Sequence, residues 1–448
     1  MGHIRTLFAG IITLSLFATM LMATLPGSVS ASPTWQVGDK WALAGEKDIG
    51  QIWDGTFGPL INSSFSNSGP PTNMTLTSTS FHGKMMMYAL FEVTAVTASN
   101  VTIQIKIVAN LTISANMAVN GNFPAPGFYN FSSSNTPTYV NKDITVSSQM
   151  AAGSSGTITV VMASDTMAIK SFDATVSSYM KGYIAATNSP DYAYNQAHTE
   201  AVLSYGTLNS PIDVNALTGM HAVFSPAIQV ISDTMTVGEV RVTTSNVTAS
   251  ETISGIANIG SLPAIWREAY FTPSAAQWGM TGFPMDLAKI YNPYPDGIPI
   301  DNGTIATSSG PTGTNIAYLR DKTVDDAVSG SVVAREYGLQ SGGSTDVFSF
   351  LLNPANGHAL GSTSTIPMGQ TQMIFTTHAT AVGSTQTAIS AIDKQVAERQ
   401  SYATVTGTTG GTTGGALGIS SDLLIIIVVI VIVAVAVIAG VVVMRRKK

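Results

Sequence analysis

The chain has 448 residues, no cysteine, a formal net charge of −6 and only 10% charged residues. The lack of cysteine excludes a small domain held by disulfides, so any folded part must be stabilised by core packing. Basic residues form no patch outside the C-terminus, which argues against nucleic acid as a partner. Ser, Thr, Asn and Gly supply most of the remaining polar positions.

The N-terminus has the pattern of an export signal. An apolar segment at residues 7–25 follows the basic Arg5, and a Pro-Gly pair ends it. Small residues at 29–31 form a cleavage site of the expected kind. We therefore predict a signal peptide over residues 1–31. An uncleaved signal anchor is the alternative, because the apolar segment is longer than usual.

The mature chain opens with WQVGDKW, in which Trp35 and Trp41 flank a Val-Gly-Asp turn. We expect both tryptophans to begin the first strand and to cover the core. The clearest strand is 101–114, where odd positions are apolar and even positions, except Val108, are polar. This alternation predicts a long antiparallel strand with one buried face. Other predicted strands, rich in β-branched and aromatic residues, are 88–97, 157–170, 235–248 (with a β-bulge at Gly238), 346–352 and 372–382.

Helical patterns are fewer. A Ser-Pro-Asp start predicts a helix over 189–204, and Thr323 with Asp326 predicts a second over 323–332. A third is predicted over 387–402, where Ile389, Ile392 and Val396 share one face. The fold class is therefore mainly β, with antiparallel β-sandwich-like domains and a few short helices.

The length of the chain and an internal sequence similarity indicate two β-rich ectodomains, over residues 32–210 and 211–403. The segment 92–102 recurs with one deletion as 239–248, which suggests duplication. The alternative is coincidence, since a chain rich in Thr, Ser and Val produces such matches easily.

The loop 262–300 differs from its surroundings because aromatic side chains alternate with proline. Rigid aromatic groups give a large contact area, so this loop is a candidate interaction surface for a glycan or a neighbouring subunit. The alternative is that it packs on its own sheet. The candidate contact residues are Trp266, Tyr270, Trp278, Tyr291 and Tyr294.

No sequence motif indicates catalysis, a cofactor or a metal centre. The hydrolase, zinc-protease and nucleotide-binding signatures are absent, and the histidines are scattered singly. Acidic residues in 296–303 and 321–326 offer a weaker alternative, a Ca²⁺ site, although neither has the order of a known loop. A scattered carboxylate pair for glycoside hydrolysis has no local motif and stays open.

Seven N-x-[ST] sequons make the chain a predicted glycoprotein. Asn110 lies on the polar face of the predicted strand 101–114, and Asn100 has the same parity. The alternative is chance, because Asn, Ser and Thr are abundant. The sequons are at Asn62, Asn73, Asn100, Asn110, Asn130, Asn246 and Asn302.

The C-terminus predicts a membrane anchor. A Gly/Thr-rich stalk at 404–422 precedes an uncharged apolar run at 423–444, which as a helix spans about 33 Å. The basic tail 445–448 should stay in the cytoplasm. The ectodomain is then extracellular, at the cell membrane. Without Arg5 and the tail, 15 Lys and Arg face 26 Asp and Glu, a formal charge of about −11.

The opening WQVGDKW, the Ser/Thr/Asn-rich body, the Gly/Thr stalk and the single basic-ended anchor together resemble archaeal S-layer-type and cell-surface glycoproteins. The resemblance implies a structural or adhesive role without catalysis. Many copies on one membrane would also favour self-association. The alternative is a tethered hydrolase or solute-binding receptor. A deep pocket with convergent polar groups would favour the tethered hydrolase or receptor. Flat, self-complementary faces would favour the structural or adhesive role.

Overall fold

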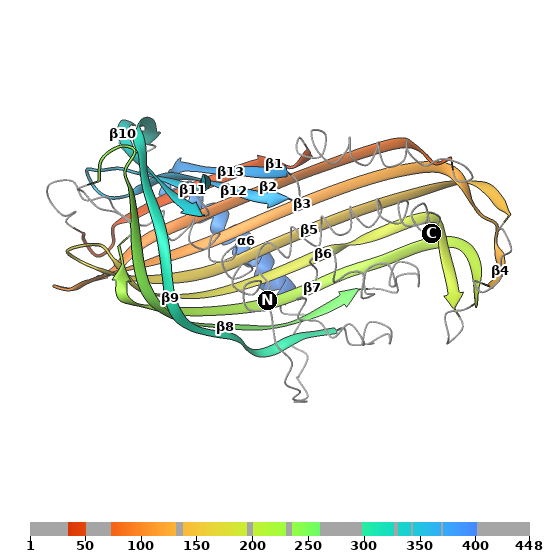
Figure 1. The fold of residues 1–448 in the computed structure, drawn as a ribbon, viewed down its shortest axis with the longest axis horizontal. Coiled ribbons are helices and arrows are strands. Elements are labelled where there is room, and N and C mark those ends of the chain that lie inside the picture. The colour runs from red at the N-terminus through yellow and green to blue at the C-terminus, as the bar shows by residue number, and fades with distance from the viewer. Residues whose placement is uncertain are drawn as a thin grey trace.

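The structure is a computed structural model that describes residues 35–50, 73–130, 138–194, 200–229, 235–259, 298–326, 330–341, 344–368 and 371–400. The described part is mainly β and antiparallel, as predicted, with one long helix (Figure 1). The elements are β1 Lys40–Asp48, β2 Thr75–Val96, β3 Asn100–Pro124, β4 Gly127–Asn130, β5 Tyr139–Ala163, β6 Ile169–Tyr194, β7 Glu200–Ile228, β8 Val240–Ile259, β9 Ile298–Asp326, β10 Gly330–Ser341, β11 Ser344–Leu352, β12 Ala359–Met368, β13 Thr371–Thr380 and α6 Val382–Gln400.

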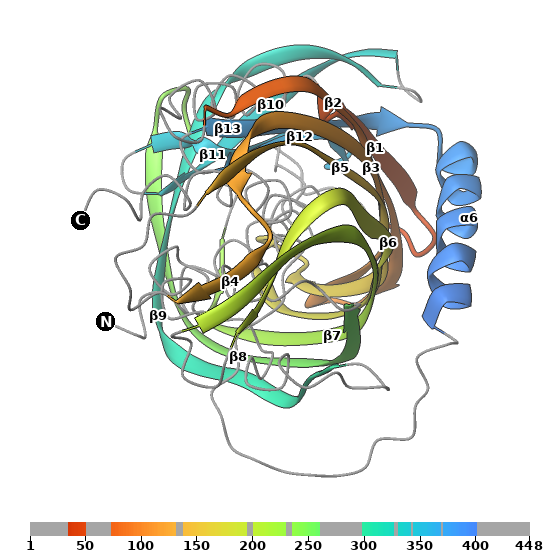
Figure 2. The same ribbon diagram turned by 90° about the vertical axis from the view of Figure 1, so that its right-hand side faces the viewer.

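All the described strands belong to one 13-stranded sheet that closes on itself. The sheet order is β4-β7-β6-β5-β3-β2-β1-β13-β12-β11-β10-β9-β8, and β8 also pairs with β7. Figure 2 shows the ring from one end, with α6 outside it. The ranges 32–210 and 211–403, predicted as separate sandwich-like domains, thus contribute to a single continuous sheet. Their predicted boundary falls inside β7.

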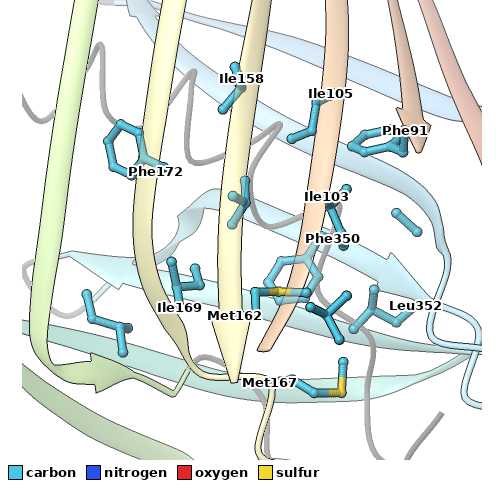
Figure 3. Packing of buried hydrophobic residues seen from close by; sticks show 14 of the residues in the cluster. Phe91, Ile103, Ile105, Ile158, Met162, Met167, Ile169, Phe172, Phe350 and Leu352 are labelled. Carbon is cyan, nitrogen blue, oxygen red and sulfur yellow. The ribbon is translucent and has the colours of Figure 1, made fainter. Parts of the chain in front are cut away.

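The inside of the ring is apolar because the strands alternate. In β3, Val101, Ile103 and Ile105 point inward and are almost completely buried, as the alternating sequence predicted. They meet inward side chains of the second half of the chain, such as Tyr337 and Phe350. Figure 3 shows this packing between opposite walls of the sheet. Trp35 and Trp41 belong to the same cluster, so their predicted place in the core is confirmed.

A second inner cluster comes from the first half alone. Strands β2, β3, β5, β6 and β7 are 22 to 29 residues long, whereas β10 to β13 have only 9 to 12. The long strands therefore extend beyond the short ones. Their extra length carries apolar residues such as Phe81, Met150 and Ile212.

The turn before β1 recurs before β8. Gly38 and Gly238 both have positive φ (96° and 85°), which glycine adopts without strain. Gly38 N donates to Val93 O at 2.8 Å, and Gly238 N donates to Tyr318 O at 2.7 Å. The turns around Gly38 and Gly238 therefore share one backbone geometry. Gly238 itself lies in this turn and not in a β-bulge.

The helix α6 packs across the outer face of β1, β2, β3, β5 and β6. Ile389, Ile392 and Val396, the predicted apolar face, are buried against outward side chains of the sheet, including Leu90 and Val108. The helix predicted at 387–402 is therefore confirmed, although it begins earlier, at Val382.

The other two predicted helices are wrong. Residues 189–204 contain the end of β6 and the start of β7, and residues 323–332 contain the end of β9 and the start of β10, and each of these two strand ends pairs with its partner. In both segments strand pairing provides backbone hydrogen bonds that outweigh weak local helix signals. The predicted strand 157–170 is interrupted by a turn at 164–166.

Several predictions fall outside the described residues. These are the signal peptide, the stalk, the C-terminal span and tail, and the part of the aromatic loop before residue 298. Within the described part, no helix is long and apolar enough to span a membrane.

Candidate binding groove on the outer face of the sheet

A groove of about 790 Å³ lies on the outer face of β1, β2, β3, β5 and β6. Its floor comes from β3 and β5, the two central strands. Its walls come from longer side chains on β2 and β6. The floor consists of Thr112, Ser114, Gln149 and Ala151, and the walls of His82, Lys84, Lys181 and Tyr183.

Strand register places these side chains in two rows. The first row runs from Lys84 through Thr112 and Ala151 to Lys181. The second runs from His82 through Ser114 and Gln149 to Tyr183. Paired residues share a face of the sheet, and their neighbours along each strand point to the opposite face. The groove is therefore hollow mainly because the small side chains of Thr112, Ser114 and Ala151 lie between the longer ones of β2 and β6.

The charges around the groove largely cancel. Lys84 Nζ lies 2.7 Å from Glu46 Oε1, and Lys181 Nζ lies 3.7 Å from Asp213 Oδ2. These four side chains are 44 to 61% exposed, so the pairs shape the local potential more than they stabilise the fold. Asp48 accepts a hydrogen bond from Gly50 N at 2.8 Å. The groove is thus polar but almost neutral.

The polar surface continues along the strands beyond the groove. Asn116 Nδ2 donates to Ser80 Oγ at 3.4 Å, in the row after His82 and Ser114. Thr145 and Thr187 share a hydrogen bond at 2.5 Å one row further on. Hydroxyl and amide groups therefore line an extended strip on the outer face of β2, β3, β5 and β6.

The histidines do not converge. His82 is in the groove, whereas the exposed His221 lies 2.5 Å from Asp173 Oδ1. His358 stacks on Trp41 with ring centroids 4.4 Å apart, and burial lowers its pKa. His378 is on β13, and His198 lies outside the described residues.

The two acidic stretches are not brought together in the described part of the chain. Asp321 accepts a hydrogen bond from the Tyr318 hydroxyl at the end of β9. Burial and this carboxylate raise the pKa of Tyr318 to about 12. Asp296 lies outside the described residues. Among those described, no group of three or more His, Cys, Asp or Glu side chains could hold a metal ion.

The sequons differ in exposure. Asn73, Asn130 and Asn246 are exposed, whereas Asn100 and Asn110 are half-buried. Lys170 Nζ donates to Asn100 Oδ1 at 2.5 Å, and Asn110 Oδ1 is buried without a hydrogen-bond partner. Asn302 is on β9, and Asn62 lies outside the described residues, as do Trp266, Tyr270, Trp278, Tyr291 and Tyr294.

Sequence reasoning missed the groove, although one signal was present. The even positions of β3 and the odd positions of β5 carry small hydroxyl and amide residues where a solvent-exposed strand commonly carries charges. Comparison with known proteins adds nothing to this: no family model, curated protein or solved structure matches the chain.

Proposed function

We propose that this protein is a cell-surface receptor, held by its C-terminal span, that binds a polar ligand in the groove of its extracellular domain. The observation that supports this is an open groove of about 790 Å³ whose lining side chains come from neighbouring strands of one sheet face; its volume lies in the range of small-molecule sites, roughly 300–1,000 Å³, and its open side leaves one face of a ligand in contact with solvent. Polar side chains from β2, β3, β5 and β6 converge on it. This favours the tethered receptor over a purely structural surface glycoprotein.

The fold suits such a role because the groove is built on strands. Its floor residues are fixed by pairing on both sides, so the donors and acceptors need little reordering when a ligand arrives. The Gly/Thr-rich sequence at 404–422 would allow the domain to turn on its anchor. Binding, rather than bond cleavage, is the activity that we assign to this site.

A steric block tests the proposal. The full-length protein would be heated in nanodiscs with a panel of neutral sugars, amino acids and carboxylates, and unfolding temperature recorded. A ligand bound in the groove of the folded protein raises that temperature, because it stabilises the folded state by a free energy that grows with the logarithm of 1 + [ligand]/Kd. Ala151→Trp fills the floor and should abolish the rise, while Thr159→Trp, outward on the same strand but outside the groove, should not. If every panel member leaves the temperature unchanged, the receptor proposal fails.

A lateral structural role is the second candidate, because apolar side chains are exposed on the outer face of β8. Val242 is 66% exposed and Val240 46% exposed. Contacts between neighbouring copies would cover these side chains. Confinement to one membrane would raise the effective concentration of the copies, so that many weak contacts together hold them in place. Val242→Lys should then disperse the protein on a crowded supported bilayer. Dispersed wild-type protein would exclude this role.

We also infer that the sheet arose by duplication. β1, β2, β3, β5, β6 and β7 form one unit, and β8 to β13 form the other, with β4 as an addition to the first. The matching turns at Gly38 and Gly238 support this, as do the turns at 164–166 and 354–356. Met167 and Gly357 follow these two turns, and both have positive φ.

A further inference from the structure

We infer that the ligand of the groove is a neutral oligosaccharide lying along β3 and β5, an inference that rests on the receptor function proposed above. Three features of the groove lead to this class: its charge balance, the chemistry of its floor, and the polar strip beyond it.

Charge balance argues against a strongly ionic ligand. Each wall lysine already has a carboxylate neighbour, Glu46 for Lys84 and Asp213 for Lys181. A phosphate or carboxylate ligand would have to compete with these acids. A cation would meet the lysines at the walls. An uncharged ligand leaves both pairs intact and can still accept hydrogen bonds from the ammonium groups.

The floor and one wall match the two faces of a sugar. Thr112, Ser114 and Gln149 offer hydroxyl and amide groups that can both donate and accept hydrogen bonds, as sugar hydroxyls require. Tyr183, at the edge of the second row, adds an aromatic ring with a polar tip. Aromatic rings pack against the apolar C–H face of a pyranose, and the hydroxyl can bond to its rim.

The strip beyond the groove indicates a chain of sugars rather than a single unit. Ser80 with Asn116, and Thr145 with Thr187, continue the hydroxyl and amide surface in the strand direction. A ligand that extends along the strands reaches more of these groups as its length increases. Affinity should therefore rise with chain length.

The test uses the full-length protein in nanodiscs and neutral gluco-, manno- and N-acetylglucosamine oligosaccharides of increasing length, with binding measured by calorimetry. We expect at least one series to bind, with affinity increasing with length. Gln149→Ala and Tyr183→Ala should each weaken binding by about tenfold or more, as the loss of a hydrogen-bonding or stacking group does. Gln104→Ala is the matched control, because Gln104 is also an exposed outward glutamine but lies outside the groove.

The outcomes separate this inference from the proposal beneath it. If no oligosaccharide binds, but a panel ligand of another class does and Ala151→Trp abolishes that binding, the receptor stands and the oligosaccharide inference is overturned. If oligosaccharides bind equally well to wild type, Gln149→Ala and Tyr183→Ala, the groove is not their site and the inference is again overturned. If neither sugars nor panel ligands bind, both fail.

Discussion

At the scale of single residues, protonation of His358 makes the stability of the core depend on pH. It stacks on Trp41 and lies near Trp35, and burial is the main cause of its lowered pKa, which Asp39 and Asp326 partly oppose. The unfolded chain has a His pKa of about 6.5 and so takes up the proton first as pH falls. The stabilising effect of neutral His358 is therefore complete above about pH 6.5 and is lost as pH falls through the lower, folded-state pKa.

We expect His358→Phe to flatten the acid side of the stability profile. The variant keeps an aromatic ring against Trp41 but cannot be protonated. Thermal midpoints measured at intervals between about pH 8 and pH 5 should fall less steeply than those of the wild type. His378→Gln, at an exposed position, serves as the control and should follow the wild type. If the thermal midpoint of His358→Phe falls with pH as steeply as that of the wild type, groups other than His358 cause the pH dependence of stability.

Asp393 fixes α6 to the sheet by two polar contacts. Its carboxylate lies 3.0 Å from Lys106 Nζ and accepts a hydrogen bond from the Ser155 hydroxyl. Asp393→Asn removes the charge, and we expect a loss of about 1 kcal/mol in unfolding free energy. Urea unfolding of the variant and the wild type measures this difference in unfolding free energy. Lys394→Gln, in an exposed pair 3.9 Å from Glu398, should change stability by less than about 0.5 kcal/mol. Equal effects would contradict the docking role.

Sequon exposure predicts a pattern of glycan occupancy. Asn73, Asn130 and Asn246 are accessible, whereas Asn100 bonds to Lys170 and the amide oxygen of Asn110 is buried. We expect glycans at the three exposed positions and a bare Asn110. Peptide mapping of native protein by mass spectrometry provides the measurement. Full occupancy at Asn110 together with bare exposed sites would refute the pattern.

At the scale of elements, periodicity was informative where it was long. The strand 101–114 and the helix 387–402 each repeat one pattern over several turns or pleats, and both exist. The segments 189–204 and 323–332 offered only a capping residue and a short apolar face. Their strand pairing involves partners that local propensity does not describe. The groove escaped prediction for a related reason, because its floor and walls become neighbours only through the register of β2, β3, β5 and β6.

The apolar face of α6 should contribute more to stability than its polar contacts. Ile392 is 6% exposed and packs in the cluster with Leu90 and Val108. Ile392→Ala leaves a cavity between helix and sheet, and we expect a loss of about 2–4 kcal/mol. Gln395→Ala, on the exposed face of the same helix, should be nearly neutral. Urea unfolding of both variants decides the point, and a small loss in Ile392→Ala would mean that α6 is only loosely attached.

At the scale of the whole molecule, the sequences of the two chain ends predict on which side of a membrane each end lies. The signal segment and the basic tail 445–448 predict an outside N-terminus and an inside C-terminus. Protease added to intact cells should remove the ectodomain and leave a short membrane-embedded stub, detected with an antibody to the tail. An ectodomain that stays intact in sealed cells but is digested after lysis would reverse this topology.

The pairing of β1 with β13 has a consequence for how the protein is made. Ala42 is opposite Thr380, so the first and last strands of the ring meet although most of the chain separates them. During synthesis, β1 emerges early and has no partner on that side until β13 follows it. Contacts between such distant segments form slowly, and an open strand edge can pair with another chain. Folding of this protein should therefore depend on chaperones that cover the unpaired edge of β1, and a ribosome that stalls before β13 should release a product prone to aggregation.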